Sequence, residues 1–445
     1  MASSQRRTGA DACPGALDVH QAADGGLARV RVPGGQLTAE QLRVVVESAA
    51  DLGNGVVELT SRANLQVRGL APGTEVDLAA RLAAVGLLPS LSHEKVRNIM
   101  ASPLGPGDLV AELDELLRAT PALAALPGRF LFALDDGTGD VAWLGADLTA
   151  VPVDPHHSRN SQSRTPAPST LHPPTASTPH SASASDPASG PHPSVDGPHP
   201  TPGGQPTPIL SGGGLGRGRD GLPVDRCGQL HAVLLGGVDL GIRVRREDTA
   251  RVLVTLAGDF LRLRDGHWRI AELGPQVAEV AAAVGTSDAR IAVGAPPTAG
   301  PMGPLVFADG SPGFGAVAPL GRITAAQAAV LGTVIITPWR GVVVRGDGRG
   351  LAEAGLLTEW GAPGIGVTAC AGKPGCAKAL ADVRSAALAV DQPGRAVHWS
   401  GCGRRCGRPA GAVIDVVATA DGYLLDGRAI PGGQVVGAVA DRRQQ

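Results

Sequence analysis

The sequence predicts an α+β fold that contains two copies of one unit, and three observations support this prediction. Residues 37–69 and 323–346 both read as a capped helix followed by two strands. A second helical segment follows in each copy, which gives the order strand–helix–strand–strand–helix that is typical of ferredoxin-like units. A low-complexity segment, residues 154–222, lies between the copies and leaves both patterns intact.

The first helix of each copy begins with the same capping pattern. Thr38 is followed three residues later by Gln41, and Thr324 is followed by Gln327 at the same spacing. A threonine and a glutamine at this spacing can satisfy each other's backbone N–H groups, which is the capping box of a helix start. In the first copy an apolar stripe at helical spacing follows and predicts one buried face. It consists of Leu42, Val45, Val46 and Ala49.

The strands and the second helix also correspond. Residues 55–69 align with 332–346, and both predict a strand, a tight connection and another strand. Residues 82–88 align with 351–357, and both predict a second helix whose end is marked by a glycine. Segments rich in Ala, Gly and Val can align by chance. Four segments in one order with one capping chemistry favour duplication, and hence a pseudo-twofold molecule with a shared central cleft.

Composition narrows the classes of function. The chain has 445 residues, 43% of them hydrophobic and only 2% aromatic, so the core must consist mainly of Ala, Val and Leu. A net charge of −2 without a basic stripe argues against nucleic-acid binding. We find no run of 18 apolar residues that would predict a membrane span. No apolar stretch follows Arg6 and Arg7, so we expect no secretory signal and a cytoplasmic protein.

Residues 154–222 differ from the rest of the chain in composition. They are dense in Pro, Ser, Thr, Gly and His and cannot bury enough apolar surface to offset chain entropy. We therefore expect a disordered insert. It carries six of the eleven histidines, but their irregular spacing favours a solvated segment over a metal store.

Four cysteines gather near the C-terminus. Cys370 and Cys376 have the spacing C-x5-C, and Cys402 and Cys406 have C-x3-C. Four thiolates suit a 4Fe–4S cluster or a structural zinc. Zinc turns favour C-x2-C or C-x4-C, so the spacing here favours iron–sulfur, and the glycines around the ligands would let backbone approach the cluster. Four unrelated buried thiols are the remaining alternative. Cys13 and Cys227 lie far away and have no assigned role.

These motifs resemble those of the nitrite/sulfite reductase superfamily. The cysteine motif is Thr-Ala-Cys370-Ala-Gly-Lys-Pro-Gly-Cys376 followed by Ser-Gly-Cys402-Gly-Arg-Arg-Cys406, and Thr60-Ser-Arg62-Ala-Asn64 lies in the first copy. The resemblance implies duplicated ferredoxin-like half domains joined to iron–sulfur catalytic domains with pseudo-twofold symmetry. It also implies that the segment around Arg62 and the loop at Arg97 line a tetrapyrrole pocket. The expected substrate-binding residues are Arg62, Asn64, Arg68, Arg97 and Asn98.

The resemblance and the repeat together predict the domain boundaries. We expect a first ferredoxin-like half domain at 12–90 and a second one at 301–361. A first catalytic domain should occupy 91–153 and 223–295, on either side of the insert. An iron–sulfur cluster domain should occupy 362–440.

Within the superfamily the chain most resembles the precorrin-3B synthase family. The supporting segments are Ala12-Cys13-Pro14-Gly15 and residues 26–35, together with the short gap between the cysteine pairs. The resemblance implies oxygen-dependent hydroxylation of precorrin-3A at the meso carbon between rings A and D, with closure of a γ-lactone. Precorrin-3A, oxygen and an external electron donor are then the expected partners. Arginines suit the substrate's carboxylates because they donate bidentate, charge-assisted hydrogen bonds.

The second redox centre stays open between sirohaem and a mononuclear non-haem iron. Sirohaem would be linked to Cys406, whereas non-haem iron would need histidine and carboxylate ligands. His93, Glu94 and His398 are nearby candidates, but their spacing matches no ligand signature, and we assign no catalytic residue.

Three other functions remain as alternatives. The first is a sirohaem-dependent sulfite or nitrite reductase, although Arg404 and Arg405 in the C-x3-C turn and Trp339-Arg340 in the second copy depart from the reductase pattern. The second is a non-catalytic protein with a structural zinc. The third is a ferredoxin-like electron carrier, which an arginine-bearing cleft argues against.

Overall fold

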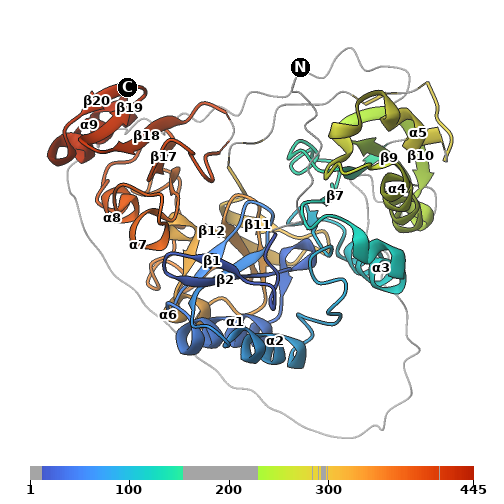
Figure 1. Cartoon of the computed structure of the whole chain (residues 1–445), viewed down its shortest axis with the longest axis horizontal. Coiled ribbons are helices and arrows are strands. Elements are labelled where there is room, and N and C mark those ends of the chain that lie inside the picture. Colours follow the sequence, from blue (N-terminus) through green and yellow to red (C-terminus); the bar gives the residue numbers. More distant parts are fainter. Residues whose placement is uncertain are drawn as a thin grey trace, which may run out of the picture. The chain divides into compact units, whose positions relative to one another are not determined.

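The structure is a computed structural model that describes residues 13–153, 229–282, 284–288, 290–291, 297, 299–409 and 411–445. The predicted disordered insert at 154–222 lies outside the described residues, as does Cys227. The described chain forms a mixed α and β structure with five-stranded sheets (Figure 1). No helix in this part of the chain is long and apolar enough to cross a membrane.

The first ferredoxin-like half is built on a sheet of order β1-β2-β5-β4-β13, in which β13 (Arg322–Ile323) comes from the second half. Its own strands are β1 (His20–Ala22), β2 (Gly25–Val30), β4 (Val57–Leu59) and β5 (Leu65–Leu70). Helices α1 (Ala39–Leu52) and α2 (Glu75–Ala84) follow β3 and β5, respectively, and lie together beneath the sheet in Figure 1. Both hydrogen bonds of the predicted capping box at Thr38 are present, and the predicted apolar stripe of α1 is buried.

The second half has the order β11-β12-β15-β14-β3. Its own elements are β11 (Gly303–Val306), β12 (Pro312–Val317), α6 (Ala325–Ala329), β14 (Val334–Ile336) and β15 (Gly341–Arg345). The predicted capping box at Thr324 is also present.

Each half lends one short strand to the other. Strand β3 (Gln36–Leu37) of the first half pairs with β14, and β13 (Arg322–Ile323) of the second half pairs with β4. One hydrophobic core therefore contains residues of both halves, among them Val57 and Val334. The duplicated ferredoxin-like fold is confirmed, and the reciprocal exchange makes the two halves one packing unit.

The predicted helix at residues 351–357 is wrong. Residues 349–355 form turns, and Leu357 instead bridges to Val317. Gly348, Gly350 and Gly355 have φ between 74° and 83°, a conformation that an α-helix does not contain. The turns that contain these glycines follow β15 in the second half, where the helix α2 follows β5 in the first half.

The middle of the chain forms a third sheet of order β10-β9-β8-β7-β6. The strands are β6 (Ile99–Ala101), β7 (Phe132–Leu134), β8 (Leu148–Val153), β9 (Leu230–Leu235) and β10 (Val238–Arg245). Helices α3 (Gly107–Ala119), α4 (Thr249–Leu263) and α5 (Val277–Ala282) pack around a core that includes Phe130, Phe132 and Phe260. Val153 pairs with Leu230, so the long insert joins two neighbouring antiparallel strands.

The C-terminal sheet positions the cysteines. Its strands are β16 (Val367–Ala369), β17 (Val397–Ser400), β18 (Ile414–Thr419), β19 (Gly422–Leu425) and β20 (Arg428–Ile430), in chain order across the sheet. The helical segments are α7 (Gly372–Gly375), α8 (Val383–Leu388) and α9 (Val435–Gln444). Strands β16 and β17 are parallel, so their carboxyl ends meet at one edge. Cys370 directly follows β16 and Cys402 lies two residues beyond β17.

Candidate cluster and anion-binding sites

The four predicted cysteine ligands lie together at the edge of the C-terminal sheet. Cys370, Cys376 and Cys402 are half-buried, and Cys406 is exposed. Burial raises the pKa of the Cys406 thiol, and the nearby thiols of Cys370, Cys402 and Cys376 contribute to the same shift. The backbone N–H of Gly401 donates to Cys370 Sγ at 3.1 Å, the kind of contact that stabilises a metal-bound thiolate.

The spacing of these sulfurs distinguishes a cluster from a single metal ion. In a tetrahedral zinc site with Zn–S bonds of about 2.3 Å, the sulfurs lie about 3.8 Å apart. In the described chain, no three of the four cysteine sulfurs lie within 4.8 Å of one another. In a 4Fe–4S cluster each thiolate binds a different iron, so the sulfurs stand further apart. A spacing wider than that of a zinc site is compatible with a 4Fe–4S cluster.

Charged side chains hold the backbone of both cysteine loops. Arg384 Nε donates to the carbonyl of Cys370 at 3.2 Å, and Arg68 Nη2 donates to that of Gly375 at 2.6 Å. In the second loop, Arg340 Nη2 donates to the Gly407 carbonyl at 3.2 Å. His398 Nε2 contacts the Cys406 carbonyl at 3.2 Å. The loops are thus fixed by residues of both ferredoxin-like halves and of the C-terminal sheet.

A pocket of about 320 Å³ lies on the first ferredoxin-like half. It is lined by Cys13, Pro14, Arg29, Thr60, Ser61, Arg62, Asn64 and Arg129. Arg62 Nη1 donates to the carbonyl of Arg129 at 3.2 Å. Burial, together with the nearby positive charges of Arg269 and Arg29, lowers the pKa of Arg62 to about 10, so positive charge in this pocket is only partly compensated.

Two further arginines add to this positive charge. Arg29 Nε and Arg31 Nη1 are buried, and neither has a hydrogen-bond partner among the described residues. Arg31 is only 4% exposed, and burial with the adjacent Arg29 lowers its pKa to about 9. A buried guanidinium nitrogen without an acceptor is costly. An anion that enters the pocket would supply the missing negative charge.

The predicted asparagines support this pocket from behind. Asn64 Oδ1 accepts from the N–H of Val32 at 2.9 Å, and Asn64 Nδ2 donates to Asn98 Oδ1 at 2.8 Å. Asn98 Nδ2 in turn donates to the carbonyl of Phe130 at 3.0 Å. Both side chains are 1% exposed, so they tie the segment around Arg62 to the third sheet.

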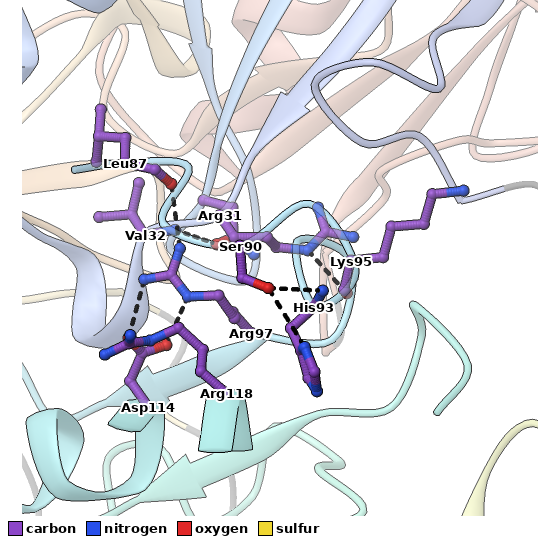
Figure 2. Close-up of polar contacts among 10 residues, drawn as sticks. Arg31, Val32, Leu87, Ser90, His93, Lys95, Arg97, Asp114 and Arg118 are labelled. Atoms are coloured by element: carbon purple, nitrogen blue, oxygen red, sulfur yellow. Dashed lines mark hydrogen bonds and ion pairs between the residues drawn. The ribbon is translucent and has the colours of Figure 1, made fainter. Parts of the chain in front are cut away.

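The predicted substrate arginines Arg97 and Arg68 face protein groups instead of the pocket. Arg97 makes two hydrogen bonds with Asp114, at 2.6 and 3.0 Å, and one with the Leu87 carbonyl at 3.1 Å (Figure 2). Arg68 makes two hydrogen bonds with Asp24, at 3.0 and 2.8 Å. Their positions suit a role in holding loops in place. Direct contact with a substrate stays a prediction for both.

The candidate ligands of a non-haem iron do not come together. His93 hydrogen-bonds Ser90, Ser92 and the Thr120 carbonyl, and Glu94 accepts from the N–H of Ala16 (Figure 2 shows His93 beside Ser90). His398 is fully buried, and burial lowers its pKa to about 4, so it is neutral. Of the described His, Cys, Asp and Glu residues, only Asp135, Asp136 and Asp140 form a group within 4.8 Å. His93, Glu94 and His398 therefore do not fit a mononuclear iron site.

Two of the pocket's three arginines, Arg29 and Arg129, are not among the predicted site residues. Arg29 lies in the apolar strand β2, and a charged residue in such a strand, followed by Arg31, is a signal that could have identified it. Arg129 comes from a distant loop, and only the tertiary structure brings it to Arg62.

Comparisons with known proteins agree with this fold. Residues 20–85 match the family described as "Nitrite/Sulfite reductase ferredoxin-like half domain". A precorrin-3B synthase of Sinorhizobium sp is 30% identical over 131 residues, which are 28% of each chain. A ferredoxin–nitrite reductase of Leptolyngbya laminosa is 31% identical over 121 residues, or 24% of each chain. The matches thus span about a quarter of these relatives.

A solved structure extends the likeness to most of the chain. The NirA protein of Mycobacterium tuberculosis superposes with a TM-score of 0.59 and 18% sequence identity. The superposition covers 88% of this chain and 71% of NirA. This likeness concerns the fold alone.

Proposed function

We propose that this chain, which carries a nitrite/sulfite reductase ferredoxin-like half domain, is an oxidoreductase acting on precorrin-3A in the manner of precorrin-3B synthases. The observation that supports the proposal most is the pocket with Arg29, Arg62 and Arg129, whose positive charge is only partly compensated. Precorrin-3A carries several acetate and propionate arms. Arginines are suited to bind such carboxylates with charge-assisted hydrogen bonds, and the buried Arg29 Nε has no acceptor among the described residues.

In this proposal the pocket binds and orients the carboxylate arms. Arg62 donates to the backbone carbonyl of Arg129, which fixes the Arg62 guanidinium against the loop that carries Arg129. Asn64 and Asn98 hold the segment around Arg62 against the third sheet and limit its movement. An oriented arm would place the ring edge at a fixed distance from the reacting centre. Arg97 and Arg68 would fix the surrounding loops through Asp114 and Asp24.

Cys370, Cys376, Cys402 and Cys406 would hold a 4Fe–4S cluster, which supplies electrons one at a time when bound. In the proposed reaction one oxygen atom of O₂ enters the tetrapyrrole as a hydroxyl group and the other leaves as water. The two electrons and two protons that this requires come from an external reductant and from solvent. His93, Glu94 and His398 do not form a ligand set, so the proposal assigns no residues to the second redox centre.

A sirohaem-dependent sulfite or nitrite reductase is the second candidate function. It is favoured by the matches to ferredoxin–nitrite reductases of two cyanobacteria, at 31% and 32% identity. The arginine pocket suits it as well, because sirohaem also carries carboxylate arms. The two candidates differ in what they do with oxygen and with sulfite.

The test is to incubate the anaerobically purified protein with precorrin-3A and a chemical reductant, with and without oxygen. We expect a product one oxygen atom heavier than the substrate, formed only when oxygen is present. The same preparation should not reduce sulfite. Six-electron reduction of sulfite, with no oxygen-dependent tetrapyrrole product, would instead select the reductase.

A further inference from the structure

A row of polar residues crosses the sheet of the first ferredoxin-like half. Arg29 on β2 lies opposite Gln66 on β5, and Gln66 lies opposite Glu58 on β4. Glu58 lies opposite Arg322 on the exchanged strand β13. Residues directly opposite one another in a sheet point to the same face. The row therefore begins at the arginine-lined pocket and ends at a strand of the second half.

Glu58 is the member of this row that reaches the cysteine loops. Its Oε2 accepts from Gln66 Nε2 at 2.9 Å, and its Oε1 accepts from Arg384 Nη2 at 2.5 Å. The same Arg384 donates through Nε to the carbonyl of Cys370 at 3.2 Å. The side chains of Glu58 and Arg384 are only 13% and 18% exposed. A short, largely desolvated ion pair thus stands between the sheet and the first cysteine loop.

The carboxylate of Glu58 also acts electrostatically on Arg340, which contacts the second cysteine loop. Arg340 donates to the carbonyl of Gly407, the residue after Cys406. Burial lowers the pKa of both Arg340 and Arg322, while the negative charge of Glu58 opposes this effect at each of them. Glu58 therefore offsets the charge of guanidinium groups on both sides of the cysteine loops.

We propose that Glu58 is a positioning residue that fixes the first cysteine loop to the sheet carrying the anion pocket, through Arg384, which contacts both Glu58 and the Cys370 carbonyl. The inference rests on the proposed cluster and deepens it, because it names the residue that sets the cluster's surroundings. Removal of one negative charge beside a cluster favours its reduced form. Loss of a charge-assisted hydrogen bond also loosens the Cys370 carbonyl.

The experiment compares the anaerobically purified full chain with its Glu58→Gln variant. We expect the cluster midpoint potential of the variant to move to a more positive value, and the cluster to be lost in air about tenfold faster. Asp309→Asn is the matched control, because it removes the carboxylate that pairs with Arg345 at 2.9 Å in the second half. That variant should keep the potential and the rate of the parent protein.

Arg384→Lys provides a second test should Glu58→Gln not fold. A lysine keeps the charge beside Glu58, but its single ammonium does not match the two directions of the guanidinium. We expect faster cluster loss with little change in potential. A parent protein that binds the cluster, with potential and retention unchanged in both variants, overturns the inference and leaves the proposed function intact. A parent protein without an iron–sulfur cluster overturns both.

Discussion

The two ferredoxin-like halves share their topology and differ in what they do with the turn between their central strands. The first half places Arg62 there, and this side chain lines the pocket. At the aligned position the second half has Trp339, whose Nε1 donates to the Pro297 carbonyl at 3.0 Å. The indole packs against an apolar cluster that contains Met100 and Leu131. The first half has the arginine-lined pocket at this turn, and the second half has a packed aromatic ring at the corresponding position.

The sheets of the two halves differ in the same way, because the first sheet carries charged side chains where the second carries mostly apolar ones. The polar row of the first half corresponds to Gly315, Val343, Ile335 and Gln36 in the second half, which stand opposite one another on β12, β15, β14 and β3. Arg68 is buried and reaches a cysteine loop, whereas its counterpart Arg345 is exposed and pairs with Asp309. The two copies therefore kept the same sheet, while one copy makes the charged contacts and the other packs apolar side chains.

The largest effects are expected when each of the two turn residues, Arg62 and Trp339, is replaced by alanine in a separate variant. We expect Arg62→Ala to weaken binding of a carboxylated tetrapyrrole on the order of tenfold to a hundredfold, because a charged hydrogen bond is lost. Trp339→Ala should leave binding unchanged and lower the free energy of unfolding by about 2–3 kcal/mol. Quenching of uroporphyrin fluorescence measures the first effect, and urea denaturation measures the second. Equal loss of binding in both variants would show that the halves do not divide these roles.

Much of this comparison could be predicted from the sequence because it rests on local patterns. The capping boxes at Thr38 and Thr324 and the cysteine spacings are signals a few residues long, and both boxes are present in the structure. The exchange of β3 and β13 could not be predicted, since each strand has two residues and pairs with a distant partner. The pocket was only partly foreseen for the same reason, because Arg129 approaches Arg62 across 67 positions of the chain.

Asp114 illustrates the other limit of sequence reasoning. The motif around Arg97 indicated a role in a pocket, but a guanidinium interacts with whatever carboxylate the fold brings near. Asp114 lies on α3, on the same face as buried Val110 and Leu117, and is only 8% exposed. A buried aspartate in an amphipathic helix predicts a basic partner, although the sequence does not say which arginine it is.

A difference in stability of intermediate size is expected when the carboxylate partners of the corresponding arginines, Arg68 and Arg345, are removed. Asp24→Asn should lower the free energy of unfolding by about 2 kcal/mol, because Arg68 is largely buried and would keep its charge without a counterion. Asp309→Asn should have little effect, since the side chains of Arg345 and Asp309 are both more than half exposed to solvent. Thermal unfolding of the two variants tests this difference. A larger loss in Asp309→Asn would contradict the assignment of the buried pair to the first half.

The smallest effect is expected at the two helix caps, where the halves have the same chemistry but different helix lengths. Thr38→Ala and Thr324→Ala each remove one capping bond, and each should cost about 1 kcal/mol. Helix α1 has 14 residues, so loss of its cap should loosen only the first turn. Helix α6 has five residues, so loss of its cap should open the whole helix. Hydrogen exchange should therefore accelerate throughout residues 325–329 in Thr324→Ala, but only near residue 40 in Thr38→Ala. Uniform acceleration along α1 would mean that its stability depends on the cap more than on its buried stripe.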